Sequence, residues 1–544
     1  MNKLSLQRKE IEEVYGKISP FELKDKLIDL AEESKKSGAQ SLLDAGRGNP
    51  NWIAASPREA FFTFGQFAVE ESRSVWSDHD LAGMPKKEDI SKRFIDFIRK
   101  HKDDPGIELL RKMINYGVTV KGFNADDWIY ELVDGIIGDN YPQPDRMLTH
   151  VENVVNDYLI QELCYNEPLE GKFKTFAVEG ATAAMCYIFD TLIANNILSK
   201  GDKIAIMAPI FTPYLEIPHL PRYNFEVIKV LADEMTDDGR RTWQYSSKEI
   251  EKMRDSSIKA LFIVNPSNPA SVAMKPENVK QLKNIVDNDN PDLMIISDDV
   301  YSTFVDDFRS IMADLPYNTI GVYSYSKYFG VTGWRLGTIS LYEHNVFNKL
   351  LKEQDEDKKE RARIRYGGIS TDPDNIDFID RIVADSRQVA LNHTAGLSTP
   401  QQVQMAFFSL FAIVDKENRY KKLTKDICRR RKRLLFEGLG VDLQTNPFDA
   451  SYYTQFDLLE WAARNYNIDF VKYLQESFKP VDILIRLAEQ SSIVLLGSSG
   501  FNGPEWSIRI SLANLNDESY SKIGEVLHKV MKDYANEWNE SKTT

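Results

Sequence analysis

Residues 319–337, TIGVYSYSKYFGVTGWRLG, contain the pattern that decides the fold of this chain. The stretch opens with an apolar run, Thr319 to Tyr323, of the length and character of a buried strand. Ser324-Tyr325-Ser326-Lys327 follows directly, and Arg335 stands eight residues beyond Lys327. A lysine at the end of a buried strand, with hydroxyls before it and an arginine after it, is arranged to form a Schiff base on a phosphorylated cofactor.

The same tetrapeptide occurs a second time, as Ser519-Tyr520-Ser521-Lys522. This copy lies in a polar segment without an apolar run before it, and Val530 stands where the first copy has Arg335. One of the two copies is therefore a chance occurrence. Because serine, tyrosine and lysine are ordinary strand-end residues, the neighbouring motifs must decide what the first copy does.

Composition excludes several classes of protein. The 544 residues are enough for two or three domains, and a 42% apolar, 28% charged content is typical of globular chains. We find no apolar run near the roughly 20 residues that span a bilayer, and no secretory signal, so we expect a cytoplasmic protein with no membrane partner. A net charge of −14 argues against nucleic acid as a partner. Three separated cysteines and seven scattered histidines argue against a disulfide framework and a metal site.

Short apolar runs alternate with helical stretches through the middle of the chain. This alternation predicts an α/β fold with a mostly parallel sheet covered by helices on both faces. The runs are 174–178, 203–207, 225–230, 260–264, 293–296, 319–323 and 337–341. From about residue 395 the hydrophobic pattern changes to that of long amphipathic helices, with candidate strands at 493–496 and 506–512. This pattern predicts a smaller α+β domain.

Polar motifs follow four of these runs directly. They are Gly180-Ala181-Thr182, Asn265 to Asn268, Asp298, and Ser324 to Lys327. Because ligands of parallel sheets bind beyond the carboxyl ends of the strands, we expect these motifs to share one site.

Asp298-Asp299-Val300-Tyr301 supports pyridoxal phosphate as the cofactor. A carboxylate at Asp298 would keep the pyridine nitrogen protonated, so that the ring accepts electrons from the substrate. Tyr301 and Asn268 would bind the phenolate oxygen of the ring. The plain alternative is a strand end that caps a helix.

The phosphate would lie at the start of a helix. Gly180-Ala181-Thr182 leads into an apolar helical segment and offers free N–H groups and a hydroxyl, although an ordinary N-cap threonine is the alternative. A charged contact from Arg335 contributes roughly 1.5–3 kcal/mol, more than the ~0.3–2 kcal/mol of a helix end.

Two further residues are candidates for cofactor and substrate. Phe211 follows another strand and would stack on the pyridine ring, or else pack in the core. Arg509 lies amid alternating apolar residues, where a substrate carboxylate would pair with it.

Taken in order, these motifs resemble the fold type I aminotransferases over residues 40–515 or so. The resemblance implies a Schiff base and proton transfer by Lys327, and ring contacts from Asp298, Tyr301, Asn268 and Phe211. It further implies phosphate contacts from Gly180, Ala181, Thr182, Ser324, Ser326 and Arg335, and substrate contacts from Asn268, Arg509 and the glycine loop at Gly48. Ser271 departs from the family pattern, which has glycine there.

The resemblance also implies an organisation. Residues 1–55 would form an N-terminal arm and part of the small domain, 56–394 the large cofactor-binding domain, and 395–544 the C-terminal small domain. Segments 118–170 and 343–393 are expected to be insertions. The family builds its site across a dimer interface, so a homodimer is the minimal unit, and a dodecamer is a larger assembly that the likeness implies.

The length, the insertions and the loop Ala45 to Trp52 are similar to the branch of the family that decarboxylates L-aspartate at Cβ. This likeness predicts formation of L-alanine and CO₂ through a ketimine, with aspartate aminotransferase activity as a side reaction. Arg47 is a candidate contact for the distal carboxylate, or a plain surface arginine. The alternatives are an aspartate aminotransferase proper and a non-enzymatic effector-sensing domain, although we find no DNA-binding module beside it.

Overall fold

The computed structural model describes residues 15–16, 18–37, 42–139, 146–167, 171–388 and 396–542. Parts of the predicted N-terminal arm (1–14, 17 and 38–41) therefore lie outside the described residues. The same holds for parts of the two predicted insertions (140–145, 168–170 and 389–393).

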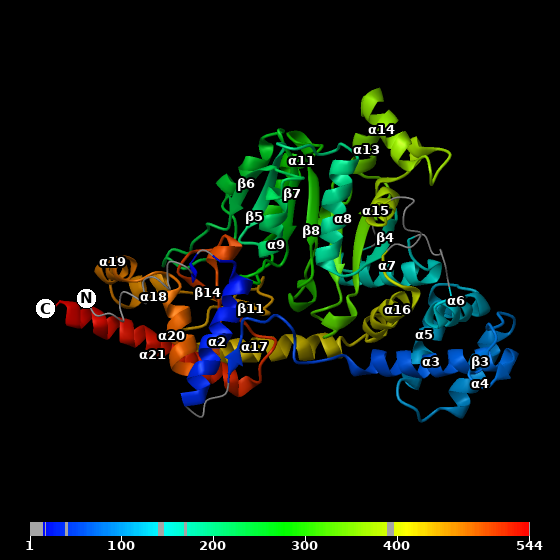
Figure 1. The fold of residues 1–544 in the computed structure, drawn as a ribbon, viewed down its shortest axis with the longest axis horizontal. Coiled ribbons are helices and arrows are strands. Elements are labelled where there is room, and N and C mark those ends of the chain that lie inside the picture. The colour runs from blue at the N-terminus through cyan, green and yellow to red at the C-terminus, as the bar shows by residue number, and fades with distance from the viewer. Residues whose placement is uncertain are drawn as a thin grey trace.

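A seven-stranded sheet forms the centre of the molecule (Figure 1). Its order is β4-β10-β9-β8-β7-β5-β6, in which β10 runs antiparallel to both neighbours and the other pairs are parallel. The strands are β4 (Phe173–Val178), β5 (Lys203–Ala208), β6 (Glu226–Leu231), β7 (Ile258–Val264), β8 (Met294–Asp298), β9 (Thr319–Ser324) and β10 (Gly337–Tyr342). The predicted α/β fold with a mostly parallel sheet is confirmed, and each predicted run overlaps one of these strands.

Alternate side chains of the inner strands enter two separate cores. In β5, Ile204 and Ile206 pack into one core, while Ala205 and Met207 pack into the other. The strands read as continuous apolar runs because both faces are covered. One face is covered by α8 (Ala181–Ala194), whose Phe189 stacks on Phe262 of β7. The other is covered by α10 (Ser247–Glu251), α11 (Pro276–Asn288) and α7 (Thr149–Leu163), whose Tyr158 meets Tyr323 of β9, and α16 (Thr399–Val414) packs on α7.

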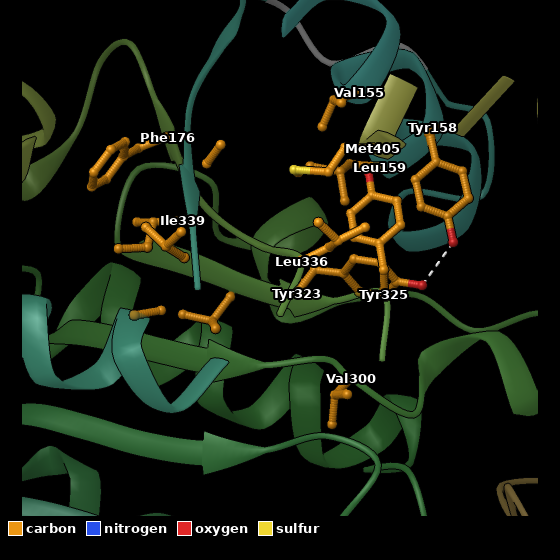
Figure 2. Packing of buried hydrophobic residues seen from close by; sticks show 14 of the residues in the cluster. Val155, Tyr158, Leu159, Phe176, Val300, Tyr323, Tyr325, Leu336, Ile339 and Met405 are labelled. Carbon is orange, nitrogen blue, oxygen red and sulfur yellow. Dashed lines mark hydrogen bonds between the residues drawn. The ribbon is translucent and has the colours of Figure 1, made fainter. Parts of the chain in front are cut away.

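Tyrosines support the turn that carries Lys327. Tyr323 and Tyr325 flank Ser324 and are buried against Tyr158 of α7 (Figure 2). The Tyr158 and Tyr323 hydroxyls lie 2.7 Å apart in a hydrogen bond, and the Tyr325 hydroxyl pairs with Ser409 at 2.8 Å. Since these hydroxyls are paired, large polar rings are tolerated in the core directly behind Ser324 to Lys327.

A helical extension projects from one side of the sheet (Figure 1). It contains α3 (Ala55–Val75), the hairpin β2 (Ser77–Asp78) and β3 (Leu81–Ala82), α4 (Ile90–Lys100), α5 (Ile107–Asn115), the π-helix η1 (Tyr116–Val120) and α6 (Ala125–Ile137). Phe62, Val69 and Trp76 of this extension recur every seven residues and are 60%, 47% and 52% exposed. They therefore form an apolar stripe that faces outward.

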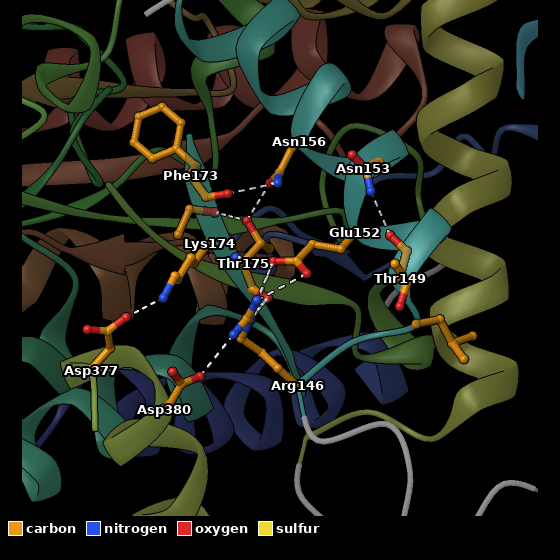
Figure 3. A network of polar contacts seen from close by, with 12 residues as sticks. Arg146, Thr149, Glu152, Asn153, Asn156, Phe173, Lys174, Thr175, Asp377 and Asp380 are labelled. Atoms are coloured by element: carbon orange, nitrogen blue, oxygen red, sulfur yellow. Dashed lines mark hydrogen bonds and ion pairs between the residues drawn. The ribbon is translucent and has the colours of Figure 1, made fainter. Parts of the chain in front are cut away.

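The two predicted insertions meet at the edge strand β4. Arg146 donates hydrogen bonds to Glu152 at the start of α7 and, at 2.9 Å, to Asp380 of α15 (Phe378–Ser386), as Figure 3 shows. Lys174 of β4 pairs with Asp377 in the same network. The second segment also contains α13 (Val346–Lys352) and α14 (Glu356–Tyr366).

A second core belongs to the opposite side of the molecule. Its sheet has the order β11-β14-β13, and β1 pairs with β12 in parallel. The strands are β1 (Leu43–Asp44), β11 (Tyr453–Asp457), β12 (Ile493–Val494), β13 (Leu496–Gly497) and β14 (Ser507–Ser511). The helices are α2 (Pro20–Ser37), α17 (Arg419–Leu439), α18 (Leu458–Asn465), α19 (Ile468–Ser477), α20 (Asp482–Ser491) and α21 (Asp517–Ser541). The predicted domain boundaries stay a prediction.

Some local expectations need correction. The predicted strand at 493–496 is two strands, because Ile493 pairs with Leu43 whereas Leu496 pairs with Arg509 in the other sheet. Strand β11 was not predicted. The second Ser-Tyr-Ser-Lys copy lies within helix α21. Among the described residues, no helix combines the length and apolar character needed to cross a membrane.

We predict that Phe262→Ala lowers the free energy of unfolding by about 3–5 kcal/mol. Phe262 of β7 stacks on Phe189 of α8 with ring centroids 4.4 Å apart, and both side chains are buried. Urea denaturation measures the change, and Ile364→Ala, at a 75% exposed position, should stay within about 0.5 kcal/mol of the wild type. Equal effects of the two substitutions would contradict this packing account.

Candidate active site

A cavity of about 280 Å³ lies where the carboxyl ends of the large sheet face β11 and β14. Its size is near the lower end of the roughly 300–1,000 Å³ of ligand pockets. The predicted site residues that line it are Gly48, Ala181, Thr182, Phe211, Asn268, Asp298, Tyr301, Ser324, Ser326, Lys327, Arg335 and Arg509. Gly180 and Arg47 do not line it. A larger cleft of about 960 Å³ beside α2 is lined by none of the predicted residues.

Lys327 lies in the turn after β9 and points at the glycine loop. Its Nζ donates a hydrogen bond to the Gly48 carbonyl oxygen at 3.3 Å. The Tyr452 hydroxyl donates to the same oxygen at 2.7 Å. The amine is therefore held at the cavity by a weak contact that a covalent partner can replace.

Asp298 ends β8 at the floor of the cavity and is buried. Its carboxylate accepts hydrogen bonds from the Tyr214 hydroxyl at 2.6 Å and from the Val300 N–H at 3.2 Å. Burial raises the pKa of Asp298 to about 6, against the opposing effect of these hydrogen bonds and of Lys327. A cation placed against this carboxylate would be strongly favoured.

Arg335 forms a cationic wall beside the first turn of α8. Its guanidinium donates hydrogen bonds to the carbonyl oxygens of Glu179 and Thr332, both at 3.0 Å. Gly180 has φ +88°, and a Cβ there would lie 2.2 Å from Arg335 Nη2. Glycine at 180 is thus required for the approach of Arg335, and Thr182 adds a hydroxyl at the same end of the cavity.

Arg509 forms the opposite cationic wall. The side chain is 2% exposed, and it donates to Asn268 Oδ1 at 3.2 Å and to the Gly46 carbonyl oxygen at 2.6 Å. Its Nε is buried and has no hydrogen-bond partner within the described part of the chain. A buried guanidinium with no carboxylate partner among the residues that the structure describes is suited to an anionic ligand.

Tyr301 and Asn268 meet between these walls. Asn268 Nδ2 donates to the Tyr301 hydroxyl at 3.4 Å, and that hydroxyl lies 3.1 Å from the Tyr453 hydroxyl. Burial raises the pKa of Tyr301 well above its ordinary value. The hydroxyl is therefore a neutral hydrogen-bond donor.

Ser271 explains the departure from the family pattern. Its φ of +66° is a left-handed conformation that glycine adopts easily. The Ser271 hydroxyl accepts hydrogen bonds from the N–H groups of Tyr452 and Tyr453, at 3.1 and 3.2 Å. A side chain thus holds the start of β11 against the Asn-Pro turn.

Aromatic rings close one side of the cavity. Phe211 lies before α9 (Thr212–Glu216) and contacts Phe21 of α2 edge to face, with centroids 6.0 Å apart. Sequence reasoning missed Phe21, Tyr214 and Tyr453, which all line the cavity. Tyr214 stands three residues after Phe211, but nothing in the sequence around it distinguishes it from a core tyrosine.

Arg431 anchors the glycine loop from behind. The basic run Arg429 to Arg433 lies in α17, and within it Arg431 is buried. Arg431 donates to Asn51 Oδ1 at 2.9 Å and to the Leu512 carbonyl oxygen at 3.1 Å, and it pairs with Asp517 at 3.0 Å. By contrast, Arg47 in the loop is exposed, so its contact with substrate stays a prediction.

Comparisons with known proteins identify the family. A sequence model of the family "Aminotransferase class I and II" matches residues 177–527. The chain is 45% identical over 515 residues to a bifunctional aspartate aminotransferase and L-aspartate beta-decarboxylase from a Pseudomonas species, covering 94% of this chain and 96% of that one.

Solved structures share the fold. An aspartate aminotransferase double mutant from Thermus thermophilus aligns with a TM-score of 0.56 at 15% identity, covering 93% of this chain and 96% of that one. An aromatic aminotransferase from Pyrococcus horikoshii aligns with a TM-score of 0.54 at 17% identity, covering 92% and 99%. The predicted fold type I architecture is confirmed.

We predict that Asp299→Asn removes a pH dependence of stability in the cofactor-free protein. Asp299 is fully buried and accepts hydrogen bonds from Ser297 and Ser310, and burial raises its pKa from 3.8 to about 7. Because the folded-state pKa of Asp299 is raised, its neutral carboxyl makes its full contribution to the stability of the fold below about pH 4. This contribution is lost as the pH rises through about 7 and the buried carboxyl ionises.

Urea denaturation at several pH values measures this effect. The stability of the wild type relative to the variant should fall by up to about 4 kcal/mol between pH 4 and 8, at 1.36 kcal/mol per pKa unit. A difference that stays constant across this range would show that Asp299 is already ionised at low pH.

Proposed function

Because this chain belongs to the class I and II aminotransferase family, its cofactor is pyridoxal phosphate, and we propose that it converts L-aspartate to L-alanine and CO₂. Aspartate aminotransferase activity would accompany this reaction. The observation that carries the proposal is 45% identity over 94% of the chain to an enzyme with both activities. The cavity supports it with an amine and two cationic walls.

The residues present fit the cofactor. The buried Asp298 carboxylate supplies the negative charge that a protonated pyridine nitrogen requires, and the Tyr301 hydroxyl and Asn268 amide supply donors for a ring oxygen. Arg335, Thr182, Ser324 and Ser326, with the N–H groups at Gly180 and Ala181, would hold the phosphate. Phe211 would cover one ring face.

When bound, pyridoxal phosphate supplies an electron sink for bonds broken at the substrate's Cα and, one carbon further, at Cβ. Lys327 Nζ would form the covalent attachment and then move the proton at Cα. Asp298 would keep the ring nitrogen protonated. Arg509 would orient the substrate by binding its α-carboxylate through the unpaired Nε and the Nη groups, with Gly48 closing over it.

The number of cationic side chains that line the cavity supports decarboxylation over pure transamination. The described residues that line the cavity include three cations, Lys327, Arg335 and Arg509, and each already has a proposed role. Among the described residues of the cavity, the distal carboxylate would therefore meet no further cation for a strong ion pair. Weak binding of that group is favourable, because a bidentate arginine would stabilise the charge that must be lost. Arg47 remains the candidate for a loose contact.

We further propose a cytoplasmic enzyme that is at least a homodimer, with a dodecamer as its larger assembly. The outward stripe of Phe62, Val69 and Trp76 on the helical extension supports self-association, since exposed apolar stripes of this kind mark interfaces. Phe62 also contacts Trp334, the neighbour of Arg335, so this stripe begins beside the phosphate side of the site.

We expect sustained release of CO₂ and alanine when the holoenzyme receives L-aspartate with no keto acid present. Decarboxylation returns the cofactor to its starting form, whereas transamination converts it once and stops. Quantification of CO₂, alanine and oxaloacetate in one reaction measures the balance. A single half-turnover without CO₂ would identify an aspartate aminotransferase proper.

A further inference from the structure

Tyr453 is a buried phenol that faces the cavity from β11. Its hydroxyl lies 3.1 Å from the Tyr301 hydroxyl, and either group can be the donor. A Cβ built on Gly48 would lie 2.1 Å from the Tyr453 oxygen and 3.5 Å from Lys327 Nζ. The phenol and the amine therefore stand against the same face of the glycine loop.

The ring of Tyr453 extends from this point toward Arg509. The Arg509 guanidinium carbon lies 4.4 Å from the centroid of the ring. If the substrate amine lies at Lys327 and its α-carboxylate at Arg509, the Cα between them lies alongside Tyr453. Cβ is bonded to this Cα, so the Tyr453 hydroxyl is within reach of Cβ.

Tyr453 is held in this position by its backbone. The N–H groups of Tyr452 and Tyr453 both donate to the Ser271 hydroxyl, and Tyr453 pairs with Ser511 in the register of β11 and β14. This double anchor fixes the phenol through its backbone. Among the described residues, its hydroxyl has only the Tyr301 hydroxyl as a hydrogen-bond partner, so that it can turn its proton to a substrate carbon.

We propose that Tyr453 is a further catalytic residue, which donates the proton that replaces the departing carboxylate on Cβ. This inference rests on the proposed decarboxylation. The reaction needs an acid that protonates Cβ, and none of the roles assigned to Lys327, Asp298 or Tyr301 supplies one.

The step balances in atoms and charge. The bond between Cβ and the carboxylate carbon breaks, CO₂ leaves, and the electron pair remains with the substrate carbon skeleton. Cβ then uses that pair to take the proton from the Tyr453 hydroxyl. The resulting phenolate lies against the Arg509 guanidinium and regains a proton from water, so each turnover consumes one solvent proton.

The test is Tyr453→Phe, which keeps the ring against Arg509 and removes only the hydroxyl. Steady-state alanine formation should fall roughly 100- to 10,000-fold, the contribution of a general acid. Because loss of CO₂ precedes protonation, the variant should release about one CO₂ per site in a rapid burst. Succinate affinity of the cofactor-loaded enzyme, followed by absorbance, should stay within about threefold, since the phenol donates and does not bind the carboxylates.

The handedness of the product provides a second readout. Aspartate deuterated at Cβ in one configuration, when decarboxylated in tritiated water, yields alanine with a methyl group of one handedness if a fixed acid delivers the proton. The wild type and the control Tyr452→Phe should keep a single handedness, because the Tyr452 hydroxyl donates to the Gly48 carbonyl oxygen. Tyr453→Phe should give a mixture.

Two results would overturn the assignment. One is alanine formed by Tyr453→Phe at the wild-type rate with a single handedness. The other is an equal loss of succinate affinity and of all activities, which would make Tyr453 a substrate-binding residue. If the wild type itself releases no CO₂ from aspartate, the proposed function fails instead, and the two failures are distinguishable.

Discussion

The buried Arg509 guanidinium is the constraint on which the site depends. It binds Asn268 beyond β7, the Gly46 carbonyl beside β1, and the ring of Tyr453 in β11, so three segments distant in sequence converge on one cation. A buried cation is costly unless every donor is satisfied, and the Arg509 Nε has no partner among the residues that the structure describes. The position therefore favours an anionic ligand, which would join the two sheets across the cavity.

Both sides of the molecule contribute charged groups to the site. The large-sheet side contributes the acid Asp298 and the cations Lys327 and Arg335, while the small sheet contributes the cation Arg509 and the phenol of Tyr453. The glycine loop connects the sides, because Gly48 accepts from Lys327 and Tyr452, and Arg431 holds Asn51.

The sequence predicts the large sheet because strands covered on both faces are continuous apolar runs. It also predicts most of the cavity lining, because polar residues after parallel strands converge at one edge. Strand β11 escapes prediction, because two polar residues separate Tyr453 from Phe456, which gives neither an apolar run nor a two-residue period. The role of Ser271 depends on the N–H groups of Tyr452 and Tyr453, which are far away in sequence. Tyr214 and Tyr453 resemble ordinary core tyrosines in the sequence, because only the fold brings their hydroxyl partners to them.

The most direct test of the account is to locate the covalent attachment of the cofactor. Holoenzyme reduced with borohydride and digested should carry a reduced pyridoxal phosphate adduct, seen by peptide mass spectrometry, on Lys327 alone. Because Lys522 repeats the same tetrapeptide within helix α21, it serves as an internal control that should remain unlabelled. An adduct on Lys522 or another lysine, or none at all, would contradict the assignment of Lys327 and the roles built around it.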